Sequence, residues 1–411
     1  MTEARVEKHI IKNTDKYYDL LMDFCFKSKN LYNHGLYVLR QEFITNHKVI
    51  SYYKLDPMLR DDLEYPDYRA MPTAQTAQQT LRKLCSDFKS FLASIKEYKK
   101  NPNKYTGRPN LPRYKAKDSK YELILTNQEA KLQEGILVFP KVFQGLTVKP
   151  LCISKKDFYS FQQVRIIPNY NYLVLEIVYN IIISDDIVKN NNYIGIDLGV
   201  NNLLTITNNF NKQPVILNGK GLKSINQYYN KLNSYYQEIS KRMNNKYSTK
   251  RLKRIVTKRN NKVLDFMHKA SRYLIDYAVE NNVSKIIIGY NKGWKQNIEL
   301  SKKTNQKFVQ IPYLLLIKLI TYKAKQVGIE VILNEESYTS GTSFLDNELP
   351  TKEYYNISRR KYRGLFISNE NIPINSDVNA SYQIIKKVFP KVFTEGIEGL
   401  LLNPIKVNLS I

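Results

Sequence analysis

The chain has 411 residues, 64 of them Lys or Arg against 37 Asp or Glu, so its formal net charge is +27 at pH 7. Its 43% hydrophobic content can fill the cores of two or three ordinary domains, which excludes disorder throughout. The excess charge predicts a polyanionic partner, either nucleic acid or an anionic membrane surface. Apolar runs such as 313–317 end far short of the roughly 18 residues of a spanning helix, and no apolar leader follows the charged N-terminus. Nucleic acid is therefore the expected partner.

Three cysteines and four histidines are scattered along the chain. Cys25, Cys85 and Cys152 form no CxxC pair, so we expect neither a zinc site of the usual local spacing nor a disulfide framework. The dispersed histidines give a His-based catalytic triad little to work with. Metal chemistry must then rest on carboxylates, whose hard oxygens suit Mg²⁺ or Mn²⁺.

The N-terminal half predicts a strand, two helices and a β-rich region. Residues 4–12 alternate as in a strand, and helical spacing follows at 20–39 and, behind a possible Thr cap, at 74–95. The segment 96–120 is basic and contains Gly and Pro, which predicts an irregular loop. Short β-rich runs between 121 and 183 predict a small antiparallel barrel or sheet.

The C-terminal half begins after the polar stretch 184–192 and follows another pattern. Strands are expected at 193–197, 203–207, 214–218, 285–288 and 329–333. Helical runs lie between the later strands, and a final helix is expected from 377 to 388. Three meandering strands followed by alternating helices and strands are the order of a ribonuclease H-like α/β fold.

Two basic segments are candidates for nucleic-acid binding. The loop 104–115 interleaves cations with Tyr105 and Tyr114, although a plain linker explains it equally well. On a helix, Lys250, Arg254 and Lys258 would share one face and repel one another unless an anion lies against them; a solvated surface helix is the alternative. The candidate side chains are Lys104, Arg108, Arg113, Lys115, Lys250, Arg251, Arg254, Lys258 and Arg259.

Carboxylates at the ends of predicted elements give the sharper signal. Asp197 ends the strand Ile-Gly-Ile-Asp, where glycines leave room for a ligand; a simple turn is the alternative. Glu335 and Glu336 follow the strand 329–333, and Asp377 begins the last helix, where an ordinary N-cap is the alternative. Together, three such carboxylates can hold two Mg²⁺ ions about 4 Å apart for phosphodiester hydrolysis.

The stretch Ile-Gly-Ile-Asp-Leu-Gly also resembles the first phosphate motif of actin-like ATPases and heat-shock chaperones. Those proteins duplicate the domain and need a second phosphate loop, for which the chain after Asp197 is too short. The net charge also argues against this alternative.

Several motifs, in the same order, resemble the TnpB (OrfB) proteins of bacterial insertion sequences, which are relatives of the type V CRISPR effectors. They read Ile194-Gly-Ile-Asp-Leu-Gly-Val-Asn-Asn, Ile286-Ile-Ile-Gly-Tyr-Asn-Lys-Gly-Trp-Lys-Gln, Glu335-Glu-Ser-Tyr-Thr-Ser, Phe344-Leu-Asp-Asn-Glu and Asp377-Val-Asn-Ala. The front of the chain is similar more loosely, at Lys29-Asn-Leu-Tyr-Asn and Arg108-Pro-Asn-Leu-Pro-Arg-Tyr-Lys.

The resemblance implies a RuvC (ribonuclease H-like) nuclease domain at 187–411, preceded by a β-barrel wedge domain. The first wedge strand would be 1–15 and the remainder 119–186, with a helical recognition domain inserted at 16–118. Residues from about 335 to 376 would be a degenerate, zinc-less insert that binds the target nucleic acid, since many members carry two cysteine pairs there and this chain has none.

The resemblance also implies an activity: an RNA-guided DNA endonuclease of the bacterial cytoplasm. Its cofactors would be Mg²⁺ (or Mn²⁺) and a guide RNA made from the element end, with no zinc. Its target would be double-stranded DNA next to a short flanking motif. A monomer is favoured. A nuclease-inactive RNA-guided DNA-binding repressor and a DNA-strand transferase are the alternatives.

Carried over by position, Asp197 matches the first RuvC Asp and Asp377 the last. Most members have Glu where this chain has Gly289. Some relatives carry that Glu about one strand later, three residues before a Thr-Ser pair. Glu336 has this spacing and is the expected third ligand, with Glu335 as the fallback.

Overall fold

The computed structural model describes residues 2–183, 187–244, 249–291, 293, 302–362, 364–393 and 402–410. The chain divides into two compact units, Met1–Ile183 and Ser184–Ile411. The domain boundary expected at 186/187 adjoins residues 184–186, which lie outside the described ones. No helix in the described ranges is long and apolar enough to cross a bilayer.

The first unit contains two antiparallel sheets. The larger has the order β1 (Thr2–Lys12), β7 (Tyr172–Ile182), β6 (Phe158–Pro168), β2 (Leu123–Thr126). The smaller consists of β3 (Lys131–Gln133), β4 (Ile136–Val138) and β5 (Thr147–Val148). The described strands of this unit lie in these two sheets, with β1 and β2 at opposite edges of the larger one. The β-barrel that the resemblance implies stays a prediction.

Three helices lie between β1 and β2 in the chain: α1 (Tyr18–Asn46), α2 (Tyr52–Arg60) and α3 (Ala74–Lys100). The helix α3 begins behind Thr73, whose side chain accepts a hydrogen bond from the backbone of Thr76 in a capping box. It continues to Lys100, so the first part of the expected 96–120 loop is helical. Buried leucines of α1 and α3 share one core with the larger sheet, so helices and sheet fold as one body.

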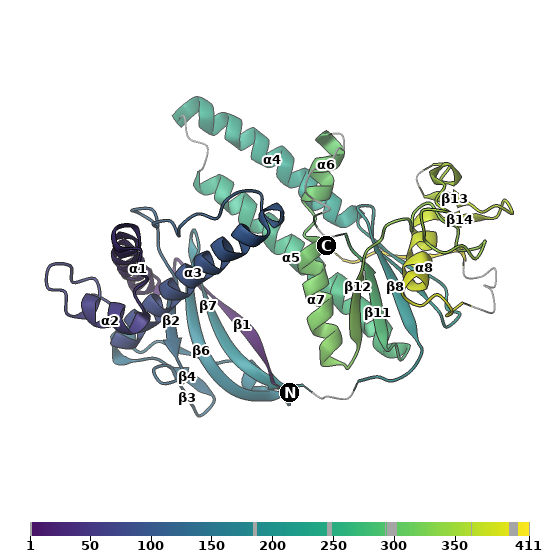
Figure 1. Cartoon of the computed structure of the whole chain (residues 1–411). Helices are drawn as coiled ribbons and strands as arrows, with labels where there is room; N and C mark the ends of the chain where they lie inside the picture. The colour runs from purple at the N-terminus through teal and green to yellow at the C-terminus, as the bar shows by residue number, and fades with distance from the viewer. Residues whose placement is uncertain are drawn as a thin grey trace. The chain divides into compact units, whose positions relative to one another are not determined.

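The second unit is built on a six-stranded mixed sheet (Figure 1). Its order is β12 (Glu330–Asn334), β11 (Lys285–Gly289), β8 (Tyr193–Leu198), β9 (Asn202–Asn208), β10 (Val215–Asn218), β15 (Ile405–Val407). The strand β9 is antiparallel to β8 and β10, whereas β11 and β12 run parallel to β8. This is the meander followed by parallel strands that the sequence predicts.

Helices cover both faces of this sheet. The elements α4 (Lys220–Asn244), α5 (Lys250–Glu280), α6 (Lys302–Val309) and α7 (Tyr313–Gln326) precede β12, and the hairpin β13 (Leu365–Ile367) with β14 (Pro373–Asn375) precedes α8 (Ser376–Val388). Figure 1 shows α7 on one side of the sheet and α8 on the other. Because both faces are covered, Ile286 and Ile288 of β11 are fully buried.

The helix α8 approaches the middle of β8 closely. A Cβ atom on Gly195 would lie 2.4 Å from the backbone oxygen of Ser381 and 2.6 Å from Cγ1 of Ile385. The Ser381 hydroxyl donates to the backbone oxygens of Gly195 and Thr205, at 2.9 and 3.1 Å. Glycine in β8 therefore allows α8 to lie directly on the sheet, which brings its first turn beside the end of β8.

We predict that Gly195→Ala lowers the free energy of unfolding of the second unit by about 1–3 kcal/mol, because α8 must move away from β8. Chemical denaturation of the full chain measures this. The control is Gly107→Ala, where an added Cβ would meet nothing within 4 Å. Equal stability of the two variants would show that α8 does not depend on this contact.

Candidate active site

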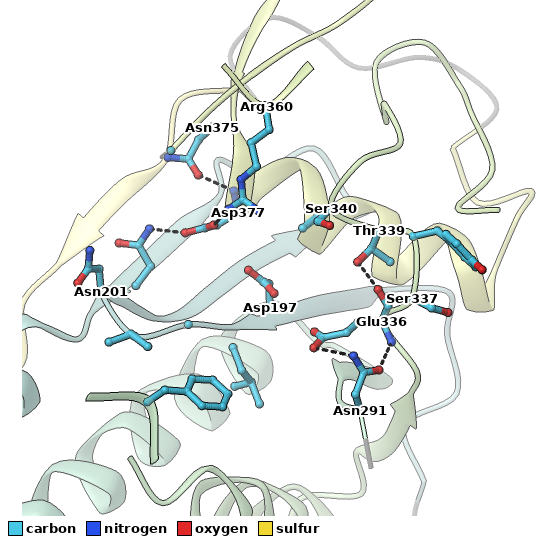
Figure 2. A pocket seen from close by; sticks show the side chains of 18 of the residues that line it. Asp197, Asn201, Asn291, Glu336, Ser337, Thr339, Ser340, Arg360, Asn375 and Asp377 are labelled. Atoms are coloured by element: carbon cyan, nitrogen blue, oxygen red, sulfur yellow. Dashed lines mark hydrogen bonds and ion pairs between the residues drawn. The ribbon is translucent and has the colours of Figure 1, made fainter. Parts of the chain in front are cut away.

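The three expected carboxylates line one cavity of about 900 Å³ in the second unit. Asp197 comes from the end of β8, Glu336 from the segment after β12, and Asp377 from the first turn of α8. Figure 2 shows Asp197 between the other two. Glu335, the fallback ligand, is exposed and is not among the lining residues. The walls also include Asn202, Asn291, Tyr338, Thr339, Tyr355 and Arg360.

Asp377 does not cap its own helix. The N-cap of α8 is Asn375, whose side-chain oxygen accepts from the backbone nitrogens of Asp377 and Val378. The Asp377 carboxylate is free of that task and faces the cavity, where Oδ2 accepts from Asn202 Nδ2 at 2.7 Å and Oδ1 lies 3.5 Å from Arg360 Nη2. The helix N-terminus favours the negative charge. The alternative that Asp377 is an ordinary N-cap is therefore wrong, because Asn375 has that role.

The backbone around Glu336 is fixed by hydrogen bonds. Its backbone nitrogen donates to Asn291 Oδ1 at 3.1 Å, and its Oε1 accepts from Asn291 Nδ2 at 3.3 Å. Lys387 of α8 donates to the backbone oxygens of Glu335 and Ser337 on either side. The carboxylate is therefore directed into the cavity by two neighbouring elements.

Gly289 ends β11 beside this carboxylate. The strands β11 and β12 are parallel, with Gly289 opposite Asn334, so both end at the same edge of the sheet. A Cβ on Gly289 would lie 3.0 Å from Glu336 Oε2 and 2.6 Å from Cδ1 of Ile384. The space next to Gly289 is thus filled by the Glu336 carboxylate and a core isoleucine, and a side chain at 289 would compete with both.

The three carboxylates share the cavity with the cationic side chains of Lys220, Arg360 and Lys406. Burial raises the pKa of Asp197 well above its ordinary value, Asp377 and Glu336 raise it further, and Arg360 opposes them. Burial also raises the pKa of Glu336 to about 7, against the effect of Lys387. Carboxylates in this condition are stabilised by a bound cation.

The donor set fits Mg²⁺ or Mn²⁺, since carboxylate and amide oxygens are the hard ligands that these ions prefer. Within the described ranges, no three His, Cys, Asp or Glu side chains are arranged to hold one metal ion among them. The three carboxylates line the same cavity, and Glu336 and Asp377 contribute to the raised pKa of Asp197. Arg360 is the cation beside Asp377.

Arg360, Asn291 and Asn202 belong to the site although sequence reasoning did not select them. Asn202 lies in the recognised motif after Asp197, and Asn291 follows the strand that ends at Gly289, so both positions carried a signal. Arg360 had none, because nothing in the sequence places the segment before α8 over the cavity.

The expected nucleic-acid-binding side chains lie in both units. In the first unit Lys104 is paired with Glu97 at 2.6 Å, Lys115 lies over the rings of Tyr32 and Tyr121, and Arg108 and Arg113 are exposed. On α5, Lys250, Arg251, Arg254 and Lys258 are exposed, and the Arg251 guanidinium lies 4.0 Å from the Tyr236 ring centroid.

Arg259 differs from the other cations of α5. Its Nε donates to Asn226 at 2.8 Å and its Nη2 to the Gln310 backbone at 2.9 Å, so it joins α5 to α4 and to the turn before α7. Lys292 and Trp294–Gln296, which belong to the motif that begins at Ile286, lie outside the described residues.

The insert at about 335–376 is organised around Arg359. This buried guanidinium donates to both oxygens of Glu348, at 2.9 and 2.7 Å, and to the backbone oxygens of Gly341 and Tyr354. Asp346 Oδ2 lies 3.4 Å away. One side chain therefore joins four segments of the insert, and bidentate pairs of this kind are among the stronger side-chain interactions.

We predict that Arg359→Ala destabilises the insert by about 3–5 kcal/mol, because two buried carboxylates lose their partner. Hydrogen exchange of the backbone amides between 341 and 369 should accelerate by orders of magnitude. Lys361→Ala, at an exposed neighbouring position, is the control and should leave exchange unchanged. Unchanged protection in Arg359→Ala would mean that packing alone holds the insert.

Residues 176–295 match the OrfB_IS605 family, described as a probable transposase. No curated protein matches the chain. Among solved structures, it is similar to a chain of the "Cryo-EM structure of the Cas12f1-sgRNA-target DNA complex" (TM-score 0.56, 16% identity, 89% of this chain and 82% of that one). It is also similar to a chain of the "Cryo-EM structure of CRISPR-Cas12f Ternary Complex" (TM-score 0.38, 15% identity, 89% and 81%).

The family match confirms the resemblance to the TnpB (OrfB) proteins that the motifs predict. The matched segment contains β8 to β11 and therefore Asp197 and Gly289. The first structural similarity adds that the mixed α/β fold is shared with a type V effector over most of both chains.

Proposed function

We propose that this relative of the TnpB (OrfB) proteins is an RNA-guided DNA endonuclease that hydrolyses phosphodiester bonds with the help of Mg²⁺. The observation that carries the proposal is the meeting of Asp197, Glu336 and Asp377, from three separate elements, in one cavity. The pKa values of Asp197 and Glu336 are raised, and buried carboxyl groups with raised pKa values are typical of functional sites.

In this proposal Asp197, Glu336 and Asp377 hold the metal. Bound there, a pair of divalent ions supplies an activated water and stabilises the leaving oxygen. The chain's own residues prepare the site: Asn202 orients Asp377, and Asn291 orients Glu336. Arg360 presents a cation at the cavity, where a scissile phosphate would find a bidentate donor once the carboxylates are neutralised.

The proposed partners are a guide RNA and a double-stranded DNA target next to a short flanking motif. The net charge of +27 supports a polyanionic partner, and the similar Cas12f1 chain is described in complex with sgRNA and target DNA. Exposed cations on α5 and in the 104–115 segment supply phosphate contacts in this proposal. Association with an insertion sequence follows from the family match.

Direct strand transfer is the second candidate, because the matching family is described as a probable transposase. A transferase joins element ends without co-purifying RNA, whereas the proposed nuclease requires it. A nuclease-inactive repressor is less favoured, since it has no need of three carboxylates kept together at an electrostatic cost.

We predict that Asp197→Asn and Glu336→Gln each lower cleavage of a matched target more than about a hundredfold, because each removes a proposed metal ligand and even outer-shell changes cost 10–100-fold. Single-turnover cleavage by the protein–RNA complex in Mg²⁺ is the measurement. Glu335→Gln is the matched control, with the same chemistry one residue away and outside the cavity. Loss of cleavage in Glu335→Gln alone would assign the role to Glu335.

The cations of α5 generate a separate prediction. Changing Lys250, Arg254 and Lys258 to Gln should reduce the slope of log K against log salt for RNA or DNA binding by about 2 to 3, close to one per lost phosphate contact. Lys269→Gln is the control, since Lys269 on the same helix is paired with Asp265 at 2.8 Å. An unchanged slope in the triple variant would make this face an ordinary solvated surface.

A further inference from the structure

The first unit contains a cavity of about 560 Å³ that the proposed cleavage chemistry does not use. One wall is α1, which contributes His34 and Tyr37. The segment after α2 contributes Asp62, Tyr65 and Asp67, and the basic 104–115 segment contributes Tyr114. Residues from three separate stretches of the first unit therefore converge here.

Three tyrosine rings are only partly covered although they line this cavity. The exposed fractions are 54% for Tyr37, 53% for Tyr65 and 45% for Tyr114. Tyr114 is held against α1, because Asn33 exchanges two hydrogen bonds with the backbone of Lys115, at 2.8 and 2.9 Å. The three partly exposed rings offer surfaces on which a planar group can stack.

The polar end of the cavity is acidic. His34 lies between two carboxylates, with Nε2 3.5 Å from Asp62 Oδ2 and Nδ1 3.6 Å from Asp67 Oδ2. The other oxygen of Asp62 accepts from the backbone nitrogens of Glu64 and Tyr65, which fixes the carboxylate against the backbone of this turn. His34 Nδ1 is enclosed and has no hydrogen-bond partner within the described part of the chain.

Positive charge borders the same cavity. The Arg40 guanidinium lies 5.0 Å from the centroid of the Tyr114 ring, which lines the cavity. An acidic floor repels a phosphate, whereas carboxylate oxygens accept hydrogen bonds from amino groups. A ligand that suits both parts is flat and carries amino donors at one edge and a phosphate at the other.

We infer that this cavity binds a single unstacked nucleobase with an exocyclic amino group, stacked on the tyrosines, with its amino group toward Asp62 and Asp67 and its phosphate toward Arg40. The inference rests on the proposed function only for the presence of a nucleic acid. Cytosine, adenine and guanine carry such a group, and uracil and thymine do not. The site therefore reads base chemistry in a unit whose other expected contacts are to phosphates.

The test is binding of short single-stranded probes to the full chain, with competition measured by fluorescence anisotropy. The probes are four tetranucleotides: the ribo forms of cytidine and uridine, and the deoxyribo forms of cytidine and thymidine. We expect cytidine to bind about 5–150-fold more tightly than uridine or thymidine, the ratio that one well-placed base contact gives. The ribo-to-deoxyribo ratio then shows whether guide or target supplies the base.

Matched variants locate the binding. Asp67→Ala should abolish the preference for cytidine, whereas Asp61→Ala, at an exposed neighbouring acid, should keep it. Tyr37→Ala should weaken all probes about 5–150-fold, since stacking contributes roughly 1–3 kcal/mol per base. Tyr37→Phe should retain binding, as should Tyr53→Ala, which removes an exposed ring outside the cavity.

Equal binding of cytidine and uridine by the wild type would overturn the inference. So would Asp67→Ala and Tyr37→Ala variants that bind the probes as the Asp61→Ala and Tyr53→Ala controls do. Competition by oligolysine in place of the nucleotides would also overturn it and identify a cationic partner. Asp197→Asn separates the two proposals: the base preference must survive this change. If the preference is absent while cleavage depends on Asp197, only the nucleobase site fails.

Discussion

Mutual repulsion among three carboxylates is the constraint on which the second unit depends. Asp197, Glu336 and Asp377 line one cavity, and the pKa of Asp197 is raised both by burial and by the other two. The fold tolerates this because the elements that carry the carboxylates are held in place by packing and by hydrogen bonds from neighbouring asparagines. Gly195 allows α8 to lie on β8, and the Asn375 cap leaves the Asp377 carboxylate free to face the cavity. A bound cation would reduce the repulsion among these carboxylates.

A carboxylate placed after β12 can reach the same cavity as one placed at the end of β11. The strands β11 and β12 are parallel and end together, so a side chain from either can reach the same cavity. A Cβ at 289 would approach the ends of the Glu336 and Ile384 side chains, so a side chain there would require both to move. Gly289 by itself suggests that a metal ligand has been lost. In the proposed site, Glu336 from the segment after β12 takes that role beside Gly289.

Much of the fold could be predicted from hydrophobic periodicity, whereas the contacts of the site residues could be found only in the structure. The strands β8 to β12 and the helix behind Thr73 were predicted because buried faces repeat at 2 or 3.6 residues, whereas the short edge strand β15 was not. For the first unit the sequence pattern leaves a barrel and an open sheet as alternatives, because strand closure depends on pairing that no local pattern encodes. Arg359 and Arg360 are adjacent in a basic chain, yet one is the buried centre of the insert and the other lines the cavity.

Manganese binding tests the central claim, that these three carboxylates form one metal site, most directly. Electron paramagnetic resonance of Mn²⁺ with the purified full chain measures it without any nucleic acid. The account predicts that Asp197→Asn, Glu336→Gln and Asp377→Asn each weaken the same binding, and that Glu335→Gln does not. Wild-type Mn²⁺ affinity in Glu336→Gln would contradict the claim and leave the position beside Gly289 without a ligand.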